Sequence, residues 1–296
     1  MESRKQGKII KGVGGFYTVL GEDGKKCVCK ARGLFRKNGQ TPLPGDNVEF
    51  SFNKKDGGYL ISILPRENEL IRPAVANIDL LLIVVSAQEP LPDLELADKL
   101  LLYCAKQRIE PVLVINKCDN GTNESAASII GQYDGAVDKI VCVSAETGYG
   151  MDALRELLMG RTICLAGQSA VGKSSMLNTL LGLELKTGEL SAKTERGRHT
   201  TRHAELIPMP NGTLIADTPG FSMLETVSVE PEEIPLMYRD FSEYSNGCRF
   251  VGCMHVSEPD CAVKEAVENG NVNRERYSRY VKILNEAIEI RRHKYD

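Results

Sequence analysis

An eight-residue stretch, Gly167-Gln168-Ser169-Ala170-Val171-Gly172-Lys173-Ser174, constrains the fold of this chain more than any other feature. It fits the pattern Gly-x-x-x-x-Gly-Lys-Ser/Thr, follows the apolar run 162–166 and precedes a helical pattern with Met176 and Leu180 on one face. Glycines let such a loop bend so that backbone N–H groups and the start of the following helix surround an anion. The stretch, together with Ser175, therefore predicts a site for nucleotide phosphates; a glycine-rich turn with an exposed lysine is the alternative.

The amino-terminal part reads as short alternating strands separated by turns, at residues 8–13, 16–20, 26–31, 47–52 and 59–64. This number of strands predicts an all-β barrel of the OB-fold type, which commonly binds nucleic acid. Residues 1–65 carry twelve Lys+Arg and six Asp+Glu, a balance of +6, so the rest must total −9 to give the net charge of −3. A basic module on an acidic body suggests a polyanionic partner, and a solvated lysine-rich face is the alternative.

Strands and helices alternate beyond residue 78, which predicts an α/β domain with a parallel sheet. The expected strands are 78–86, 111–115, 139–143, 162–166, 204–209 and 213–216, and the expected helices are 93–108, 124–133 and 152–159. Residues 66–77 read as a connector and 228–247 as an acidic loop, and two helices, 262–268 and 274–290, are expected near the end. The predicted domains are residues 1–65, 66–225 and 226–296.

A base-reading element is indicated by Asn116-Lys117-Cys118-Asp119, which directly follows the expected strand 111–115. Asn-Lys-x-Asp at a strand end is the guanine-reading signature of GTPases. The Asp119 carboxylate can accept hydrogen bonds from the ring N–H and the exocyclic amino group of guanine together, whereas ATP would leave a buried acceptor unpaired, at a cost of about 1–3 kcal/mol. Ser144-Ala145 resembles the short element whose backbone also contacts guanine. Either motif alone could be a surface turn, but joined to the phosphate loop they predict GTP.

Further residues are expected around the γ-phosphate. Lys173 would bridge the β- and γ-phosphates, and the Ser174 hydroxyl would bind Mg²⁺. Asp217-Thr218-Pro219-Gly220 fits the Asp-x-x-Gly element, in which Asp217 holds Mg²⁺ through water and the Gly220 N–H bonds the γ-phosphate; an ordinary Pro-Gly turn is the alternative. Thr201, with Thr200 as the alternative, is expected to be the second hydroxyl ligand of Mg²⁺, in a loop that orders with the triphosphate.

The order of these elements departs from that of ordinary GTPases, in which the phosphate loop comes first and the base-reading elements last. Here the base-reading elements precede the phosphate loop. Joining the old ends and opening the chain after Asp-x-x-Gly produces this order, so the sequence predicts a circularly permuted GTPase with an unchanged site. The Asp-x-x-Gly segment then leads directly into the carboxy-terminal module.

Phe221 occupies the position where many GTPases place a glutamine that orients the attacking water. Because an apolar side chain cannot position water, another residue must do so, or intrinsic hydrolysis is slow and needs a partner. His199, in the segment Gly197-Arg198-His199-Thr200-Thr201, is the hypothesis for that residue. A solvent-exposed loop histidine is the alternative.

Three cysteines and a histidine gather near the end of the chain as Cys248-x₄-Cys253-x-His255-x₅-Cys261. A Cys₃His set suits tetrahedral Zn²⁺, and four protein ligands leave no open position, so we expect one structural zinc ion. Buried free thiols are the alternative, although the segment has few apolar residues to bury them. The carboxy-terminal module is thus expected to be α-helical and zinc-binding, with arginines of its last helix available to a polyanion.

Nine cysteines, an odd number, in a chain whose start lacks an apolar leader favour a reducing compartment. The longest apolar run, 80–85, is far too short to cross a bilayer. We therefore expect a cytoplasmic protein without membrane contact.

A basic five-stranded barrel, a permuted GTPase and the Cys₃His pattern, in that order, closely resemble the ribosome-small-subunit-dependent GTPase A (RsgA) family. The resemblance spans essentially the whole chain, including Arg72-Pro73, Asn77-Ile78-Asp79 and the segment 196–201. It implies a factor that binds the maturing small ribosomal subunit and its rRNA, checks the decoding region and helps to release another maturation factor as GTP is hydrolysed. It also implies that the subunit stimulates a weak intrinsic GTPase, in agreement with Phe221. Ala170 departs from the family, which usually carries glycine there, and would strain the loop if it needs a positive φ.

Two other functions remain open from the sequence. One is an RNA-binding scaffold that uses GTP only as a ligand, and the other is a permuted GTPase of large-subunit assembly. A monomer is the expected state for a factor that docks on a larger particle.

Overall fold

The computed structural model describes residues 4–31, 35, 40–53, 57–71, 73–182, 204–217 and 229–294. The amino-terminal strands form a closed barrel around buried side chains that include Ile9, Val19, Phe50 and Leu60. The first strand pairs with both the second and the fourth, and the third pairs with the fifth, which closes the barrel and confirms the predicted OB-type architecture. The strands are β1 (Arg4–Val13), β2 (Phe16–Gly21), β3 (Lys26–Ala31), β4 (Asn47–Asn53) and β5 (Gly57–Ile63).

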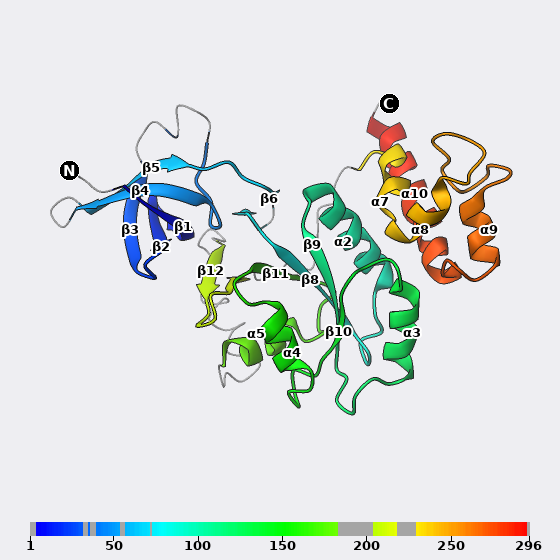
Figure 1. Ribbon diagram of the computed structural model, residues 1–296, viewed down its shortest axis with the longest axis horizontal. Helices are drawn as coiled ribbons and strands as arrows, with labels where there is room; N and C mark the ends of the chain where they lie inside the picture. The colour runs from blue at the N-terminus through cyan, green and yellow to red at the C-terminus, as the bar shows by residue number, and fades with distance from the viewer. Residues whose placement is uncertain are drawn as a thin grey trace.

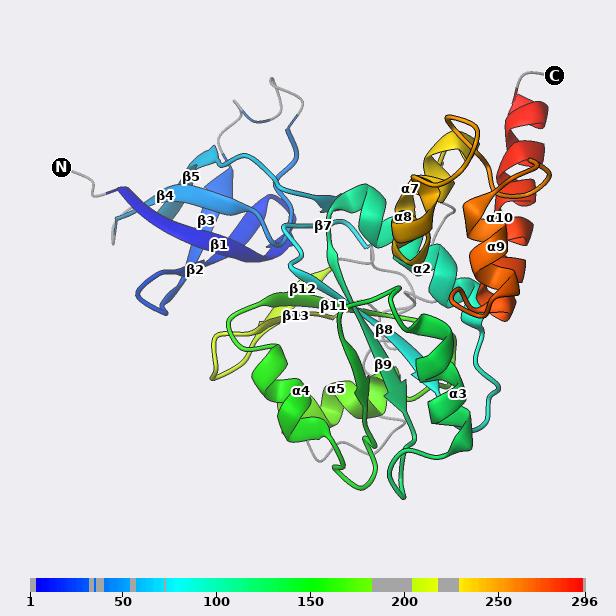
Figure 2. The same ribbon diagram turned by 45° about the vertical axis from the view of Figure 1, so that its right-hand side comes forward.

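The central domain is a mostly parallel sheet in the order β10-β9-β8-β11-β13-β12. Its β8 is buried at every position, as an apolar run between two layers of helices requires. One face packs on α2 and α3 and the other on α4 and α5, and Figure 2 shows these helix pairs on opposite sides of the sheet. The strands are β8 (Leu80–Ser86), β9 (Glu110–Asn116), β10 (Ile140–Cys142), β11 (Thr162–Ala166), β12 (Glu205–Pro208) and β13 (Leu214–Asp217). The helices are α2 (Leu94–Gln107), α3 (Glu124–Tyr133), α4 (Met151–Leu157) and α5 (Lys173–Leu181).

The barrel and the central sheet are joined edge to edge. β12 runs antiparallel to β13 on one side and to β1 of the barrel on the other, with Lys11 opposite Glu205. The same two side chains form an ion pair of 2.5 Å. The connector is also more ordered than expected, because β6 (Glu69–Leu70) and β7 (Val75–Ala76) form a small antiparallel pair within it.

The carboxy-terminal module lies on the side of the central domain opposite the barrel (Figures 1 and 2). The expectation of an acidic loop at 228–247 is wrong, because residues 231–245 form three short helical segments. Ile234, Tyr238 and Phe241 follow a helical spacing and are buried, whereas Glu232 and Glu243 are exposed on the outer face. The elements are η1 (Pro231–Glu233), α7 (Ile234–Met237), α8 (Arg239–Ser245), α9 (Ala262–Glu268) and α10 (Arg274–Lys294).

A buried ion-pair network holds α10 against the central domain. Arg276 is 2% exposed and donates to Asp98 of α2 and to Asp240 of α8, the latter at 2.9 Å. Arg279 donates to the other oxygen of Asp98 at 2.5 Å. Burial works against ionisation of Asp98 and raises its pKa, while the two guanidinium groups oppose that effect.

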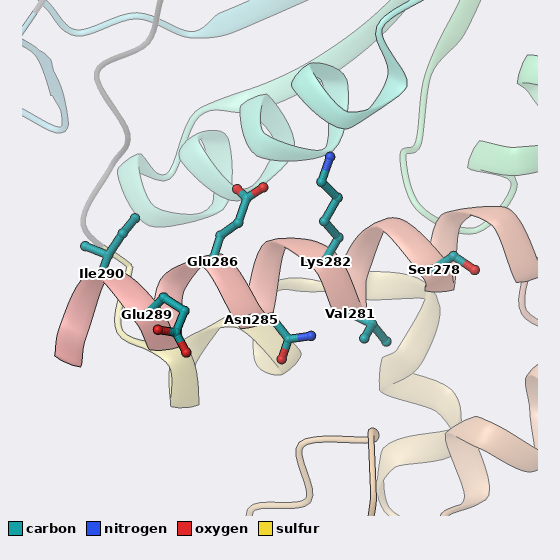
Figure 3. Close-up of a pocket in the computed structure, with 7 residues that line it drawn as sticks. All are labelled: Ser278, Val281, Lys282, Asn285, Glu286, Glu289 and Ile290. Carbon is teal, nitrogen blue, oxygen red and sulfur yellow. The ribbon is translucent and has the colours of Figure 1, made fainter. Parts of the chain in front are cut away.

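Two partly exposed ion pairs also join α10 to α2. Figure 3 shows Lys282 and Glu286 extending from α10 toward α2, where they pair with Glu95 and Lys99 at 2.6 and 2.8 Å. Both charged side chains also line a shallow pocket on α10, together with Ser278, Val281, Asn285, Glu289 and Ile290. Within the described residues, no helix is long and apolar enough to span a membrane.

Candidate functional site

The phosphate-loop residues lie between the end of β11 and the start of α5, as predicted. Gly167 has φ +136°, and a Cβ at this position would lie 2.2 Å from the Val84 carbonyl oxygen. Gly172 has φ +93°, and a Cβ there would lie 2.3 Å from Asn116 Nδ2. Both positions therefore require glycine, because neighbouring strands and loops approach the backbone too closely for a side chain.

Lys173 begins α5 and curls back over the loop. Its Nζ donates to the carbonyl oxygens of Gly167 at 2.6 Å and Gln168 at 2.5 Å. Burial lowers the pKa of the Lys173 ammonium, since low-polarity surroundings disfavour the charged form. An anion beside this ammonium would restore a favourable environment for its charge. Ser174 and Ser175 follow in the first turn of the helix.

Ala170 has φ +63°. This left-handed conformation costs a residue with a Cβ roughly 1–2 kcal/mol relative to its ordinary conformations. Ala170 thus adopts the positive φ for which strain was expected. The phosphate loop therefore carries a local strain that glycine would remove.

Asn116 ties the base-reading turn to two other elements. It ends β9 and is 2% exposed. Its Nδ2 donates to the Val171 carbonyl at 2.8 Å, and its Oδ1 accepts from the Ala145 N–H at 3.1 Å. The structure thus brings together three sequence elements that were predicted to form one site.

The Asp119 carboxylate lies beside Ser144. The Ser144 hydroxyl donates to Asp119 Oδ1 at 2.6 Å and accepts from the Thr147 N–H at 3.0 Å. Cys118 is buried beneath the turn, and its N–H donates to the Val143 carbonyl at 3.0 Å. A carboxylate fixed at the edge of the sheet in this way can accept paired N–H groups from a planar base.

Several of the predicted site residues lie outside the part of the chain that the structure describes. Asp217 ends β13, which pairs in parallel with β11, so its backbone lies at the same sheet edge as the phosphate loop, but its side chain is outside the described part of the chain. The residues expected to bind Mg²⁺ and the γ-phosphate or to act in hydrolysis that also fall outside it are His199, Thr200, Thr201 and Gly220, together with Phe221.

The loop between β8 and α2 contributes contacts that the motif analysis missed. Gln88 Nε2 donates to the Lys117 carbonyl at 2.9 Å and to Asp119 Oδ2 at 3.1 Å. The Lys117 ammonium donates to the Glu89 carbonyl, and the Asp93 N–H donates to Gln168 Oε1 at 2.9 Å. The expected strand end at Ser86 indicated only that this loop lies at the edge where parallel strands present their carboxyl ends, and not which of its residues reach the site.

The four predicted metal ligands converge in the carboxy-terminal module. The Sγ atoms of Cys248, Cys253 and Cys261 and Nδ1 of His255 all lie within 4.8 Å of one another. Cys248 Sγ lies 3.6 Å from His255 Nδ1 and 3.8 Å from Cys261 Sγ, and the last two ligands are 3.4 Å apart. Tetrahedral Zn²⁺ with ordinary bond lengths separates its ligand atoms by roughly 3.5–3.8 Å. The donor set and its spacing therefore fit one zinc ion.

Groups around the cluster fix the ligand loop. Tyr277 OH donates to the His255 carbonyl at 2.6 Å. The Glu258 carboxylate accepts from the N–H groups of Met254 and Val256 at 2.7 and 3.0 Å. Burial alone would favour the protonated acid, but these backbone donors prevail and lower the pKa of Glu258. The loop is thus held by its own hydrogen bonds as well as by its donor atoms, which suits a structural site.

The Asn-Lys-x-Asp turn and the phosphate loop meet at one edge of the parallel sheet, as in ordinary GTPases. In this chain, however, the turn precedes the phosphate loop in the sequence. The fold and the site define a circularly permuted GTPase. The profile of the RsgA GTPase family matches residues 63–227, and that of the RsgA N-terminal domain matches residues 6–60. The chain belongs to the RsgA GTPase family.

Individual relatives match over nearly their whole length. The chain is 43% identical over 293 residues to the small ribosomal subunit biogenesis GTPase RsgA of Caldanaerobacter subterraneus subsp. tengcongensis, covering 99% of both chains. It is 44% identical over 288 residues to the protein of the same name from Geobacillus thermodenitrificans, covering 96% and 98%.

Two solved structures share the fold at 36% identity. YjeQ from Thermotoga maritima superposes with a TM-score of 0.85 over 97% of this chain and 99% of its own. YloQ, described as a circularly permuted GTPase, gives 0.82 over 97% and 96%.

Proposed function

We propose that this protein acts in late maturation of the small (30S) ribosomal subunit, hydrolysing GTP to GDP and phosphate when the subunit stimulates it. Hydrolysis is coupled to release of other maturation factors. The observation that carries the proposal is the match over nearly the full length to proteins named small ribosomal subunit biogenesis GTPases. The protein is proposed to work as a cytoplasmic monomer.

The outer face of the barrel supports an RNA partner. Phe16 and Val28 are 51% and 56% exposed on neighbouring strands, and the Lys30 ammonium lies 5.6 Å from the centre of the Phe16 ring. Lys11 and Lys26 are exposed on the same barrel. Cations beside an exposed aromatic ring suit an RNA strand, because the cations attract its phosphates and the ring stacks on its bases.

The proposed roles in nucleotide binding follow from the positions of the residues. Asp119 accepts the guanine N–H groups, Asn116 and Ser144 hold the surrounding turns, and the N–H groups of the phosphate loop with Lys173 hold the phosphates. Mg²⁺, held by Ser174 and Thr201 and through water by Asp217, would neutralise the charge that develops on the phosphate oxygens.

Water attack on the γ-phosphate needs a group that Phe221 cannot supply. We assign His199 to orient the water. Unchanged single-turnover hydrolysis in His199→Ala with subunit bound would remove this role. The zinc ion assigned to the Cys₃His cluster is structural.

GTP turnover with and without purified small subunits tests the proposal, with large subunits and Asp119→Asn as controls. Stimulation by small subunits alone, lost in the variant, is the expected result. Stimulation by large subunits instead would place the protein in large-subunit assembly. Turnover unaffected by either particle would leave an RNA-binding scaffold that uses GTP as a ligand.

A further inference from the structure

The sheet fixes Gln88 beside the base-reading turn. Ser86 lies opposite Asn116 in the parallel pair β8 and β9, and the Ala87 N–H donates to the Asn116 carbonyl at 2.9 Å, one residue past the end of β8. The Gln88 N–H then donates a hydrogen bond to the Ser86 hydroxyl oxygen at 3.2 Å. The side chain of Gln88 therefore starts from a backbone held at the strand end.

The side-chain amide of Gln88 makes two bonds within that turn. Nε2 lies 2.9 Å from the Lys117 carbonyl oxygen and 3.1 Å from Asp119 Oδ2, so each acceptor can take one of its two hydrogens. Lys117 has φ +64°, a left-handed conformation that is costly for a lysine. A single amide thus supports a strained backbone turn and the carboxylate that the turn presents.

Asp119 is consequently held at both oxygens from two different loops. Ser144, after β10, holds Oδ1 at 2.6 Å, and Gln88, after β8, holds Oδ2. A carboxylate offers about four lone-pair sites, two on each oxygen, so each oxygen keeps about one for a ligand. Guanine presents its ring N–H and its 2-amino group side by side and needs one acceptor on each oxygen.

We propose that Gln88 is a positioning residue for base recognition, which holds the Asp119 carboxylate in the plane where both oxygens accept from guanine. This inference rests on the proposed function, in which Asp119 reads the base. Gln88 acts through Asp119, so its removal should weaken the contact to the 2-amino group more than the rest of nucleotide binding.

Inosine diphosphate provides the discriminating probe, because it keeps the ring N–H and the phosphates of GDP but lacks the 2-amino group. The affinities of GDP and inosine diphosphate are measured by displacement of a fluorescent GDP analogue from the full-length protein. We expect the wild-type protein to prefer GDP. In Gln88→Ala, GDP affinity should fall about fivefold, which corresponds to about 1 kcal/mol, while the affinity for inosine diphosphate should change less.

Leu91→Ala is the matched control, since Leu91 is 76% exposed in the same loop. It should leave both affinities unchanged. A general loosening of the turn would lower both affinities equally in Gln88→Ala and would overturn the inference. Unchanged affinities, or a gain for GDP showing that Gln88 competes with the base, would also overturn it. A wild-type protein that binds inosine diphosphate as well as GDP would overturn the guanine assignment itself, before any variant is made.

Discussion

The side-chain amide of Asn116 donates to the main-chain carbonyl of Val171 across 2.8 Å, joining the base-reading turn to the phosphate loop. The two residues are 55 positions apart, and in this chain the turn that contains Asn116 precedes the phosphate loop. Circular permutation leaves such a bond intact, because the bond depends on which strand ends are adjacent and not on the order in which the chain visits them. The bond therefore gives a direct test of whether the two loops act as one site.

Replacing Asn116 by alanine should uncouple the loops. The Val171 carbonyl and the Ala145 N–H would both lose their partner, and an unpaired buried polar group costs about 1–3 kcal/mol. We expect the free energy of unfolding to fall by about 2 kcal/mol and GDP binding to weaken, as measured by urea unfolding and titration. Asn120→Ala, at an exposed position of the same turn, is the control and should behave as wild type. Equal behaviour of both variants would contradict the prediction.

Replacing Ala170 by glycine should relieve strain in the phosphate loop. Glycine adopts φ +63° without a steric penalty, although it also gains freedom in the unfolded chain. We expect a net gain of about 0.5–1 kcal/mol in the free energy of unfolding, and slightly tighter GDP binding. Urea unfolding with and without GDP measures both. Ala127→Gly, on the exposed face of α3, should instead destabilise the protein by about 1 kcal/mol. A loss of stability in Ala170→Gly would refute the strain argument.

Loss of one cysteine from the metal cluster should remove zinc from the protein. Cys261→Ser is expected to lower zinc content from about one ion per chain to nearly none, because a neutral hydroxyl is a much weaker zinc ligand than the thiolate that it replaces. The carboxy-terminal module should then lose structure, seen as rapid proteolysis beyond residue 229. Cys27→Ser, in β3 of the barrel, should keep its zinc. Full zinc content in Cys261→Ser, measured by elemental analysis, would exclude the assigned ligand.

Arg276→Met should destabilise the contact between α10 and α2 strongly. Asp98 would remain buried with Arg279 as its remaining cationic partner, Asp240 would lose Arg276, and breaking a buried ion pair typically costs about 3–5 kcal/mol. Arg292→Met, which removes an exposed pair with Glu289 on the same helix, should cost under about 1 kcal/mol. Adding Asp98→Leu to Arg276→Met should recover only part of this stability, because it removes one unpaired buried charge but leaves Asp240 without Arg276 and Arg279 without Asp98. Urea unfolding of the four proteins tests the series, and similar losses in both single variants would contradict it.

Acidification should weaken the attachment of the carboxy-terminal module. Hydrogen bonds from Lys282, Arg239 and Lys106 lower the pKa values of Glu95, Asp138 and Glu233 respectively, and each pair links the module to the central domain. A carboxyl group with a depressed folded-state pKa contributes stability above its unfolded pKa of about 4, and loses it as the pH falls through the folded value. Stability should therefore decline below about pH 4.

A variant with these three cations replaced by methionine provides the comparison for the pH experiment. Its stability should depend less on pH in this acidic window, as measured by urea unfolding between pH 6 and pH 3. Zinc ligands also take up protons in acid, but they do so in both proteins. The difference between the two curves isolates the ion pairs, and parallel curves would show that the pairs contribute nothing.

The sequence predicted elements best where local signals agreed. The bounds of β11, α3 and α9 were predicted to the residue, and Asn123 caps α3 by accepting from the Ala126 N–H at 2.8 Å. The helices at 231–245 were not predicted, because the acidic residues on their exposed face interrupt a short apolar spacing. That spacing is recognisable only once the apolar side chains are seen to pack within the carboxy-terminal module. Local patterns thus identify long elements, whereas brief helices depend on what they pack against.

Site residues in recognisable motifs were predictable, and those outside motifs were not. The spacing of the Cys₃His cluster indicated its four ligands, and the structure adds that His255 presents Nδ1. Gln88 and Asp93 reach the site only because β8 lies between β9 and β11 in the sheet. That neighbour relationship is a property of the tertiary fold, so no pattern within residues 86–93 could reveal it.

The pairing of β12 with β1 also bears on the solubility of the molecule. β12 is the outermost strand of the central sheet, and an uncovered outermost strand offers unpaired N–H and C=O groups to other chains. The barrel occupies this edge and adds an ion pair between Lys11 and Glu205. The module proposed to hold RNA thus also shields the catalytic domain from self-association, which makes removal of the barrel harmful even where no RNA is present.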